Sequence, residues 1–185
     1  MYYTPYVQPR RGALIGNEIY CTLRWGNAIV KYDLGMNCLS LIDPPSPNRY
    51  NRYLALMLME DSSLGFAYIE GSNLYLWSRK VNSEGAAEWV QCRVIELEGM
   101  IPAADPDDEA YVVGFAEGVG VIFVSTGVGL FTIKLNSGQV KEVDEPGVHF
   151  SVLPYLSFYT PSPVLALAYL LTVIMHYTDS ICFFG

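Results

Sequence analysis

Residues 26–45, Gly-Asn-Ala-Ile-Val-Lys-Tyr-Asp-Leu-Gly-Met-Asn-Cys-Leu-Ser-Leu-Ile-Asp-Pro-Pro, align without a gap on residues 127–146, Gly-Val-Gly-Leu-Phe-Thr-Ile-Lys-Leu-Asn-Ser-Gly-Gln-Val-Lys-Glu-Val-Asp-Glu-Pro. The offset between the two segments is a constant 101 residues. Four aligned pairs are identical: Gly26 and Gly127, Leu34 and Leu135, Asp43 and Asp144, Pro45 and Pro146. A match of this kind at a fixed distance indicates an internal repeat.

A related copy of the repeat lies between these two segments. Each copy follows a run in which Gly precedes apolar and aromatic residues, and the three runs begin at Gly16, Gly71 and Gly118. These starts are 55 and 47 residues apart. A β-rich repeat near 50 residues is typical of the blades of a kelch-like propeller. We therefore expect an all-β fold, an incomplete kelch-like β-propeller of about three antiparallel blades.

The chain between residues 13 and 161 consists of short strand-like runs separated by turns. Asn136-Ser-Gly138, between two alternating runs, predicts a hairpin because Gly adopts positive φ at little cost. Four such strands in each repeat make one blade. We expect an extended lead-in over residues 1–12, the partial propeller over residues 13–161 and an apolar tail over residues 162–185.

The tail differs from the rest of the chain in its pattern. Residues 164–177 carry no formal charge, and no Lys or Arg follows Lys141 to orient a membrane segment. The uncharged stretch is also shorter than the roughly 20 residues that a span needs. About three blades do not close a ring, because propellers typically have four to eight. We expect the tail to form a helix on an exposed blade face, with a membrane anchor over residues 164–184 as the alternative.

Composition argues against several classes of protein. A hydrophobic content of 51% with 16% charged residues argues against disorder, and a net charge of −8 argues against binding to nucleic acid. The four cysteines form no Cys-x-x-Cys pair and the chain has two histidines, which argues against a metal site or a disulfide framework. The first residues, Met1-Tyr-Tyr-Thr-Pro-Tyr, lack the basic start and apolar core of a secretory signal. We expect a protein of the cytoplasm or the nucleus.

Two short motifs resemble ligand-binding loops only in part. Gly118-Val-Gly120 lacks the third Gly of a dinucleotide fingerprint, and no helix is expected after it. Asp105-Pro-Asp-Asp-Glu109 lacks the Gly and the final Glu that an EF-hand loop needs at its sixth and twelfth positions. We interpret the first as a tight turn and the second as a solvated acidic loop, and we expect no metal and no cofactor.

His149 is the one histidine within the repeat region. It is a candidate general base beside Ser151 or Asp144. However, Ser151 lies in no nucleophile-elbow motif, and a single histidine near a strand usually has a structural role. We therefore expect no catalytic residues and no enzymatic activity.

Aromatic and arginine side chains are the remaining candidates for function. Most of the aromatic side chains, among them Trp25, Trp77 and Trp89, are expected to pack between blades, since each blade must bury both faces. Tyr, Trp and Arg dominate affinity at protein interfaces, so the adjacent pairs of these types are the predicted partner-binding rim. The alternative for these residues is packing at the loops and blade rims. The rim residues are Arg24, Trp25, Arg49, Tyr50, Arg52 and Tyr53.

Several of these segments resemble the F-box-associated β-propeller domains of grass F-box proteins. The resemblance covers roughly residues 10–161 and includes the segment Leu153-Pro-Tyr-Leu-Ser-Phe-Tyr-Thr-Pro161 at its end. Its densest segments are Leu23-Arg-Trp-Gly-Asn-Ala-Ile-Val-Lys-Tyr-Asp-Leu34, Leu74-Tyr-Leu-Trp-Ser-Arg79 and Val112-Val-Gly-Phe-Ala-Glu-Gly-Val-Gly-Val-Ile-Phe-Val124.

The resemblance implies a propeller that selects targets for a ubiquitin ligase. In that family an N-terminal F-box docks the ligase adaptor, and the propeller has no catalytic residues. This sequence departs from the family because it shows no F-box and no early blades, and because its tail after Pro163 differs. We therefore expect a truncated, non-catalytic protein-interaction module with an unknown protein target and without adaptor binding. The alternatives are a degenerate truncated product without a stable partner and a membrane-tethered protein.

Overall fold

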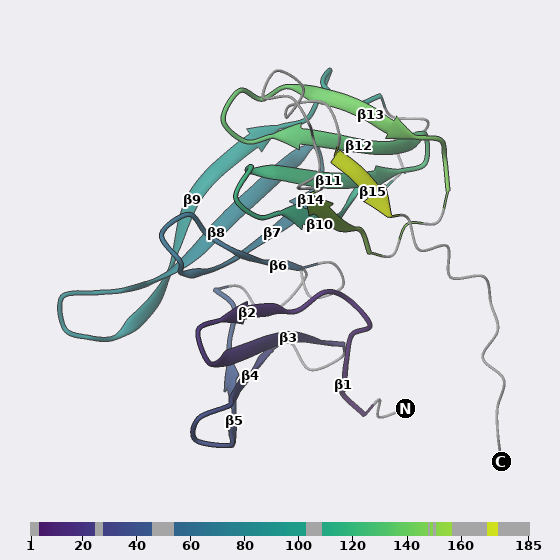
Figure 1. Ribbon diagram of the computed structural model, residues 1–185. Helices are drawn as coiled ribbons and strands as arrows, with labels where there is room; N and C mark the ends of the chain where they lie inside the picture. The colour runs from purple at the N-terminus through teal and green to yellow at the C-terminus, as the bar shows by residue number, and fades with distance from the viewer. Residues whose placement is uncertain are drawn as a thin grey trace, which may run out of the picture.

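The computed structural model describes residues 4–24, 28–45, 54–102, 109–147, 149, 151–156 and 170–173. Within these residues the chain forms antiparallel β-sheets and no helix (Figure 1). The expected all-β class is therefore confirmed.

Three meandering sheets follow one another along the chain, and a strand pair comes after them. Sheet 1 contains β1 Tyr6–Val7, β2 Ala13–Ile15, β3 Glu18–Arg24, β4 Ile29–Asp33 and β5 Cys38–Ile42. Sheet 2 contains β6 Ala55–Leu58, β7 Leu64–Glu70, β8 Asn73–Val81 and β9 Ala87–Glu96. Sheet 3 contains β10 Tyr111–Ala116, β11 Val121–Thr126, β12 Gly129–Lys134 and β13 Val140–Asp144. The last pair is β14 Leu153–Leu156 with β15 Leu170–Val173.

The 101-residue repeat in the sequence is also a repeat in strand register. Val30 of β4 pairs with Leu41 of β5, and 101 residues later Phe131 of β12 pairs with Glu142 of β13. The turns between these strands also correspond, since Asn37 and Gly138 both adopt left-handed backbone, with φ of 52° and 69°. The gapless alignment of residues 26–45 on residues 127–146 therefore pairs equivalent positions in two sheets.

The middle copy of the repeat is out of phase with the alignment expected from its glycine. Gly16 and Gly118 lie in hairpins between the first and second strands of their four-strand meanders, β2–β3 and β10–β11. Gly71 lies one strand later, in the β7–β8 hairpin. A tight turn followed by an apolar strand occurs at any hairpin, so this motif does not identify which strand follows it. The spacings of 55 and 47 residues are therefore measured between glycines that are not structurally equivalent, since Gly71 lies in a different hairpin of its sheet.

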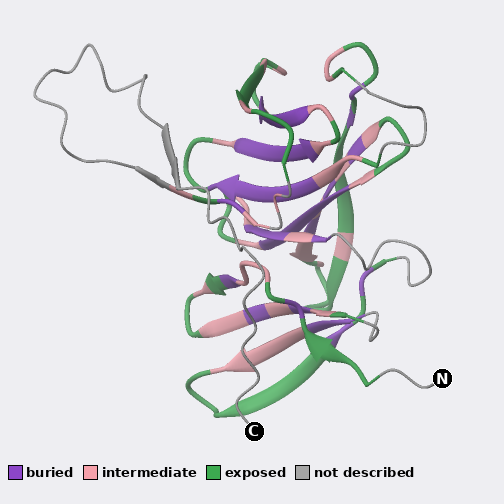
Figure 2. Ribbon diagram, turned by 90° about the vertical axis from the view of Figure 1, so that its right-hand side faces the viewer, coloured by how far each residue is buried: buried purple, intermediate pink, exposed green. Residues whose placement is uncertain are grey.

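The sheets stack face to face, and apolar cores fill the spaces between them (Figures 1 and 2). One core joins sheet 1 to sheet 2 and includes Tyr20 and Ile29 opposite Phe66. The next joins the other face of sheet 2 to sheet 3 and includes Leu76 opposite Ile122. The far face of sheet 3 packs against Val152 in a third core. Figure 2 shows this burial as purple segments inside the stack, with exposed outer strands in green.

The connection into β14 lies directly against β10. Val152 donates its backbone N–H to the carbonyl of Val113 at 2.7 Å. A Cβ placed on Gly114 would lie 2.6 Å from the carbonyl oxygen of Val152, so only Gly permits this approach. The start of the β14–β15 pair is thereby held against sheet 3.

Two expectations for the ends of the domain need correction. Tyr6–Val7 of the predicted lead-in forms strand β1 and pairs with the end of β3, so this segment belongs to sheet 1. In the predicted helical tail, Leu170–Val173 forms β15 and pairs with β14. An unpaired β14 offers main-chain groups that a neighbouring strand can satisfy, and Thr172 and Val173 are β-branched and favour strands. The remainder of the tail after residue 156 lies outside the described residues.

Candidate interaction surface

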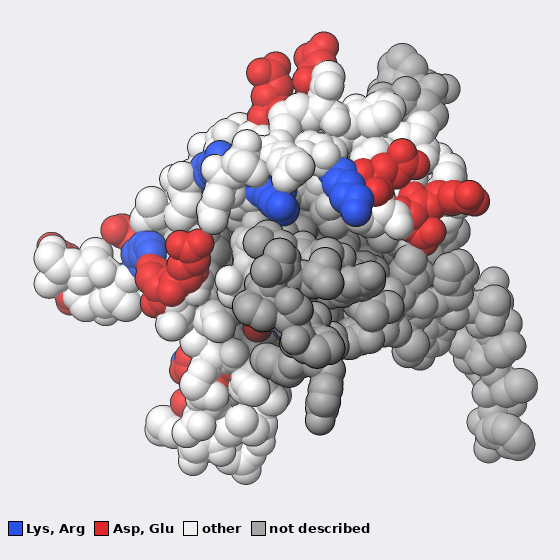
Figure 3. All heavy atoms as spheres, turned by 45° about the horizontal axis from the view of Figure 1, so that its top comes forward, with Lys and Arg blue, Asp and Glu red and all other residues white. Residues whose placement is uncertain are grey.

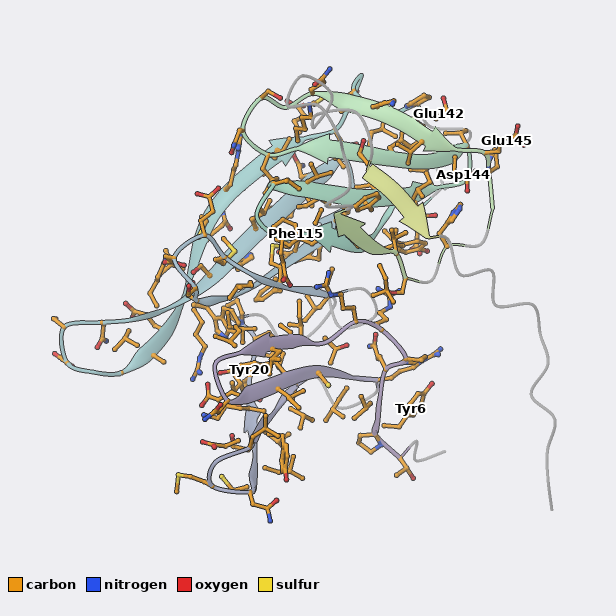
Figure 4. All side chains as sticks on the ribbon, in the orientation of Figure 1. Tyr6, Tyr20, Phe115, Glu142, Asp144 and Glu145 are labelled. Carbon is orange, nitrogen blue, oxygen red and sulfur yellow. The ribbon has the colours of Figure 1, made fainter. Side chains whose placement is uncertain are left out.

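Arg24 is the one predicted rim residue within the described part of the chain. It ends β3 with an exposed side chain, and its Nη1 donates to the hydroxyl of Tyr6 at 3.1 Å. Figure 4 shows Tyr6 on the short strand β1 at the edge of sheet 1. The other rim residues fall in the segments after Arg24 and after Pro45. The residues that lie outside the described segments are Trp25, Arg49, Tyr50, Arg52 and Tyr53.

The two described tryptophans belong to an aromatic layer between sheets 1 and 2, as the sequence predicted. Phe66 stacks on Trp77 with ring centres 6.2 Å apart and meets Trp89 edge-on at 4.8 Å. Trp89 also donates its Nε1–H to the backbone carbonyl of Asp43 at 2.8 Å, which ties sheet 2 to the end of β5. These rings therefore hold the stack together and do not form an open binding surface.

A small polar network lies on sheet 1 beside this aromatic layer. The side chains of Lys31 and Tyr20 both donate hydrogen bonds to the Glu18 carboxylate. The bond from Lys31 is the main reason that the pKa of Glu18 is lowered. Burial is the main cause of a raised pKa for Tyr20, and the neighbouring Glu18 carboxylate adds to it. The network provides hydrogen-bond partners for Glu18, Tyr20 and Lys31 at the edge of a core, and we interpret it as a structural contact.

His149 lies between two side chains of sheet 3. Its Nε2 is 3.2 Å from Oδ2 of Asp144, and its Nδ1 is 3.5 Å from Oγ of Ser125. The sequence analysis named Asp144 as a neighbour, whereas the nearby hydroxyl is that of Ser125 from β11 and not that of Ser151. Ser125 and His149 are 24 positions apart in the chain, so no local sequence pattern predicts their contact. The His149 side chain is 2% exposed, so the group is enclosed within the protein.

Of the two partial ligand motifs, the first is a tight turn and the second lies mostly outside the described residues. Gly118 and Gly120 have φ of +77° and +61° in the β10–β11 turn, and the next element is a strand. Of the acidic loop, Glu109 is described, and it accepts a hydrogen bond from the hydroxyl of Tyr111. The described segments contain no group of three or more His, Cys, Asp or Glu side chains that is able to hold a metal ion. In the same segments no helix is long and apolar enough to cross a membrane.

Charged side chains are scattered over the described surface in small groups. Figure 3 shows red carboxylates in several separate clusters, with single blue Lys or Arg side chains among them. One acidic group lies along the outer strand of sheet 3 and contains Glu142, Asp144 and Glu145 (Figure 4). Among the described residues drawn in Figure 3, Lys and Arg side chains therefore form no continuous basic patch of the kind that binds a phosphate backbone.

Sheet 1 also carries an apolar surface that was not predicted from the sequence. Directly paired residues lie on the same face of an antiparallel sheet. One row of such partners crosses sheet 1 from β2 to β5, and a second row crosses it from β3 to β5. We call this surface the outer face of sheet 1: Leu14, Ile19, Cys21, Val30, Tyr32, Leu39 and Leu41.

The signal for this face was present in the sequence. Strands β3 to β5 are apolar at both even and odd positions, which is typical of a sheet that is covered on both sides. Leu14, Leu39 and Leu41 are nevertheless 63%, 71% and 67% exposed. Soluble proteins rarely expose a contiguous apolar patch of this kind. Such patches commonly mark interaction sites.

Comparison with known proteins defines no family for the chain. No family model matches the sequence, and no curated protein matches it. Among solved structures, the chain is similar to the extracellular domain of BT4673 from B. thetaiotaomicron, described both as a one component system and as a hybrid two component system. The identity is 14% and the TM-score 0.43, and the match covers 72% of this chain and 16% of that chain. The class that the structure itself defines is an all-β protein of stacked antiparallel sheets.

Proposed function

We propose that the chain is a non-catalytic protein-interaction module, built as an incomplete kelch-like β-propeller of about three blades. In this proposal sheets 1, 2 and 3 are consecutive blades. The module resembles the target-recognition propeller of plant F-box proteins, the substrate receptors of ubiquitin ligases, and its target is a protein.

The observation that carries the proposal is the succession of first strands along the stack. Strand β2 contacts β6, β6 contacts β10, and β10 contacts β14. Strands β2, β6 and β10 each begin a meander of four strands that runs to an edge strand, and β14 pairs with β15 alone. A radial array of four-stranded meanders whose first strands adjoin is the arrangement of propeller blades.

The proposed binding surface is formed by the chain segments that follow β3 and β5. These segments contain five of the six rim residues, and the sixth, Arg24, is exposed at the end of β3. Arginine, tyrosine and tryptophan supply most of the hot spots in protein interfaces. We propose that the rim residues of both segments contact the target.

A binding role without chemistry also agrees with the environment of His149. Its ring is almost fully buried between Asp144 and Ser125, so a substrate atom has no direct approach to it. A general base must lie within hydrogen-bond reach of the proton that it removes. We propose that this group links β11 to the end of β13, that no metal or cofactor is required, and that the protein acts in the cytoplasm or nucleus.

The test compares two charge-reversed doubles in an affinity capture from plant cell extract. R49E/R52E changes the proposed rim, while K134E/K141E reverses two exposed charges on sheet 3. We expect the wild type and K134E/K141E to capture the same protein and R49E/R52E to lose it. We also expect residues 1–185 not to capture the ligase adaptor. Equal capture by all three proteins would refute the proposal that the rim residues bind the target. Strong adaptor binding would refute the proposal that the chain does not bind the ligase adaptor.

A further inference from the structure

We propose that the outer face of sheet 1 is a self-association surface, on which the same face of a second copy of this chain packs. This surface is separate from the proposed rim, and the inference does not depend on the identity of the target. Three observations support it: the internal repeat, the absence of charge on the face, and the composition of strand β5.

The internal repeat shows what covers this face elsewhere in the molecule. Ile19 pairs with Tyr32 in sheet 1 as Ile122 pairs with Ile133 in sheet 3. Likewise, Cys21 pairs with Val30 as Val124 pairs with Phe131. The two faces are therefore equivalent in register.

The exposure of the two equivalent faces differs sharply. Ile122, Val124 and Ile133 are 0% exposed because they pack against sheet 2, through Leu74 and Leu76. In sheet 1 the equivalent side chains are half-buried. A position that is built to be covered by a β-sheet is thus partly exposed among the described residues. Face-to-face packing of two sheets covers such positions.

The chemistry of the outer face favours a second copy as the covering sheet. None of its seven side chains carries a formal charge, in a chain whose net charge is −8. Two copies repel each other through most of their surface, so an uncharged face is where they approach at least cost. An apolar face is also complementary to itself, which a two-fold symmetric contact requires.

Strand β5 lacks the protection that the other outer strands have. Natural edge strands usually carry charged side chains that prevent association. Strand β9 contains Glu88 and Arg93, and β13 contains Lys141 and Glu142. Strand β5 reads Cys-Leu-Ser-Leu-Ile, without a charge. Strand β5 therefore places no charge beside Leu39 and Leu41 that would oppose packing of a second copy on the outer face.

The first experiment measures the mass of the full chain by sedimentation equilibrium over a wide range of concentration. Leu14→Asp and the double L39D/L41D place charge on opposite sides of the outer face. Val81→Asp is the matched control, because Val81 is 72% exposed and belongs to sheet 2. We expect wild type and V81D to change from one chain to two as concentration rises, and both outer-face variants to remain single chains. Near-ultraviolet circular dichroism from the aromatic layer verifies that each variant is folded.

Three results would overturn the proposal. The first is a wild type that stays a single chain at every concentration. The second is dimerisation of the outer-face variants equal to that of wild type, which would place the contact elsewhere, including in the tail. The third is loss of the dimer in L39D/L41D but not in L14D, because that result indicates edge-to-edge pairing of β5.

A second measurement uses the wild-type protein alone and does not depend on the folding of any variant. Cys21 lies on the outer face, whereas Cys92 is exposed on β9 of sheet 2. Mass spectrometry gives the alkylation rate of each thiol at low and at high protein concentration. We expect the rate ratio of Cys21 to Cys92 to fall several-fold at high concentration. A ratio that does not change with concentration contradicts packing on the outer face.

Discussion

The indole nitrogen of Trp89 donates a hydrogen bond to the backbone carbonyl of Asp43 at 2.8 Å, and this bond connects the outer strand of sheet 2 to the end of the outer strand of sheet 1. Trp77 lies in the same aromatic layer, yet its buried Nε1 has no hydrogen-bond partner within the described part of the chain. The two indoles therefore pack against similar partners and differ in one hydrogen bond.

We expect Trp89→Phe to destabilise the protein more than Trp77→Phe. Both changes remove similar ring area from the same layer. W89F additionally loses a hydrogen bond, whose net contribution is about 1 kcal/mol, while W77F removes an unsatisfied donor. Urea unfolding followed by far-ultraviolet circular dichroism measures the difference. An equal or larger loss in W77F would contradict the assigned roles.

Gly114→Ala should loosen the connection between sheet 3 and β14. The new Cβ would meet the backbone carbonyl oxygen of Val152 at 2.6 Å, and backbone cannot move aside as a side-chain end can. We expect a loss of about 1–3 kcal/mol in the free energy of unfolding, typical of overpacking. Gly35→Ala is the control, since its nearest neighbour is Oδ1 of Asp33 at 3.4 Å. Limited proteolysis near residue 152 should accelerate in G114A and not in G35A.

Alkaline pH should destabilise the protein partly through Tyr20. Its pKa is raised above the usual 10.0 mainly by burial, so the unfolded chain loses this proton first as pH rises. The associated stability is complete below pH 10 and is lost as pH rises towards the folded-state pKa. Tyr20→Phe removes this contribution. The stability difference between wild type and Y20F should therefore shrink by ~1 kcal/mol between pH 8 and pH 11. A difference that stays constant over this interval, in urea titrations at both pH values, refutes the assignment.

Deletion of residues 163–185 tests the tail. The deletion removes β15 and leaves the main-chain groups of β14 without their partner strand. We expect lower stability and faster proteolysis around β14, and we expect the full chain to be absent from carbonate-washed membranes. Leu171→Pro is the matched variant, because it disrupts pairing within β15 and retains the apolar tail. A full chain that resists carbonate extraction, and that leaves the membrane fraction on deletion, would instead identify the tail as an anchor.

Much of the fold was predictable because local chemistry specifies it. Alternation and turn residues indicated the strands, and the gapless offset identified sheets 1 and 3 as copies whose registers agree. The phase of the middle copy was not predictable from Gly71, since every tight hairpin accepts the same motif. The strand at Leu170–Val173 was also missed, because an uncharged apolar run has the same composition in a buried helix and in a paired strand.

The candidate surfaces were predictable to a smaller extent. The expectation that most aromatic side chains pack between sheets agrees with Trp77 and Trp89, whereas Arg24 remains a predicted rim residue, exposed at the end of β3. The sequence did not pair His149 with Ser125, because contacts between residues far apart in the chain leave no local pattern.

The sequence by itself determined that this protein is all-β, that two of its sheets share one register and that its strands alternate with tight turns. Only the tertiary structure decided which faces are covered. Ile122 and Ile19 occupy equivalent positions in sheets 3 and 1. Sheet 2 covers Ile122, whereas Ile19, on the outer face of sheet 1, is only half-buried. The reason is that pairing is specified by neighbouring strands within each repeat, whereas burial of a face depends on what packs next to it in space.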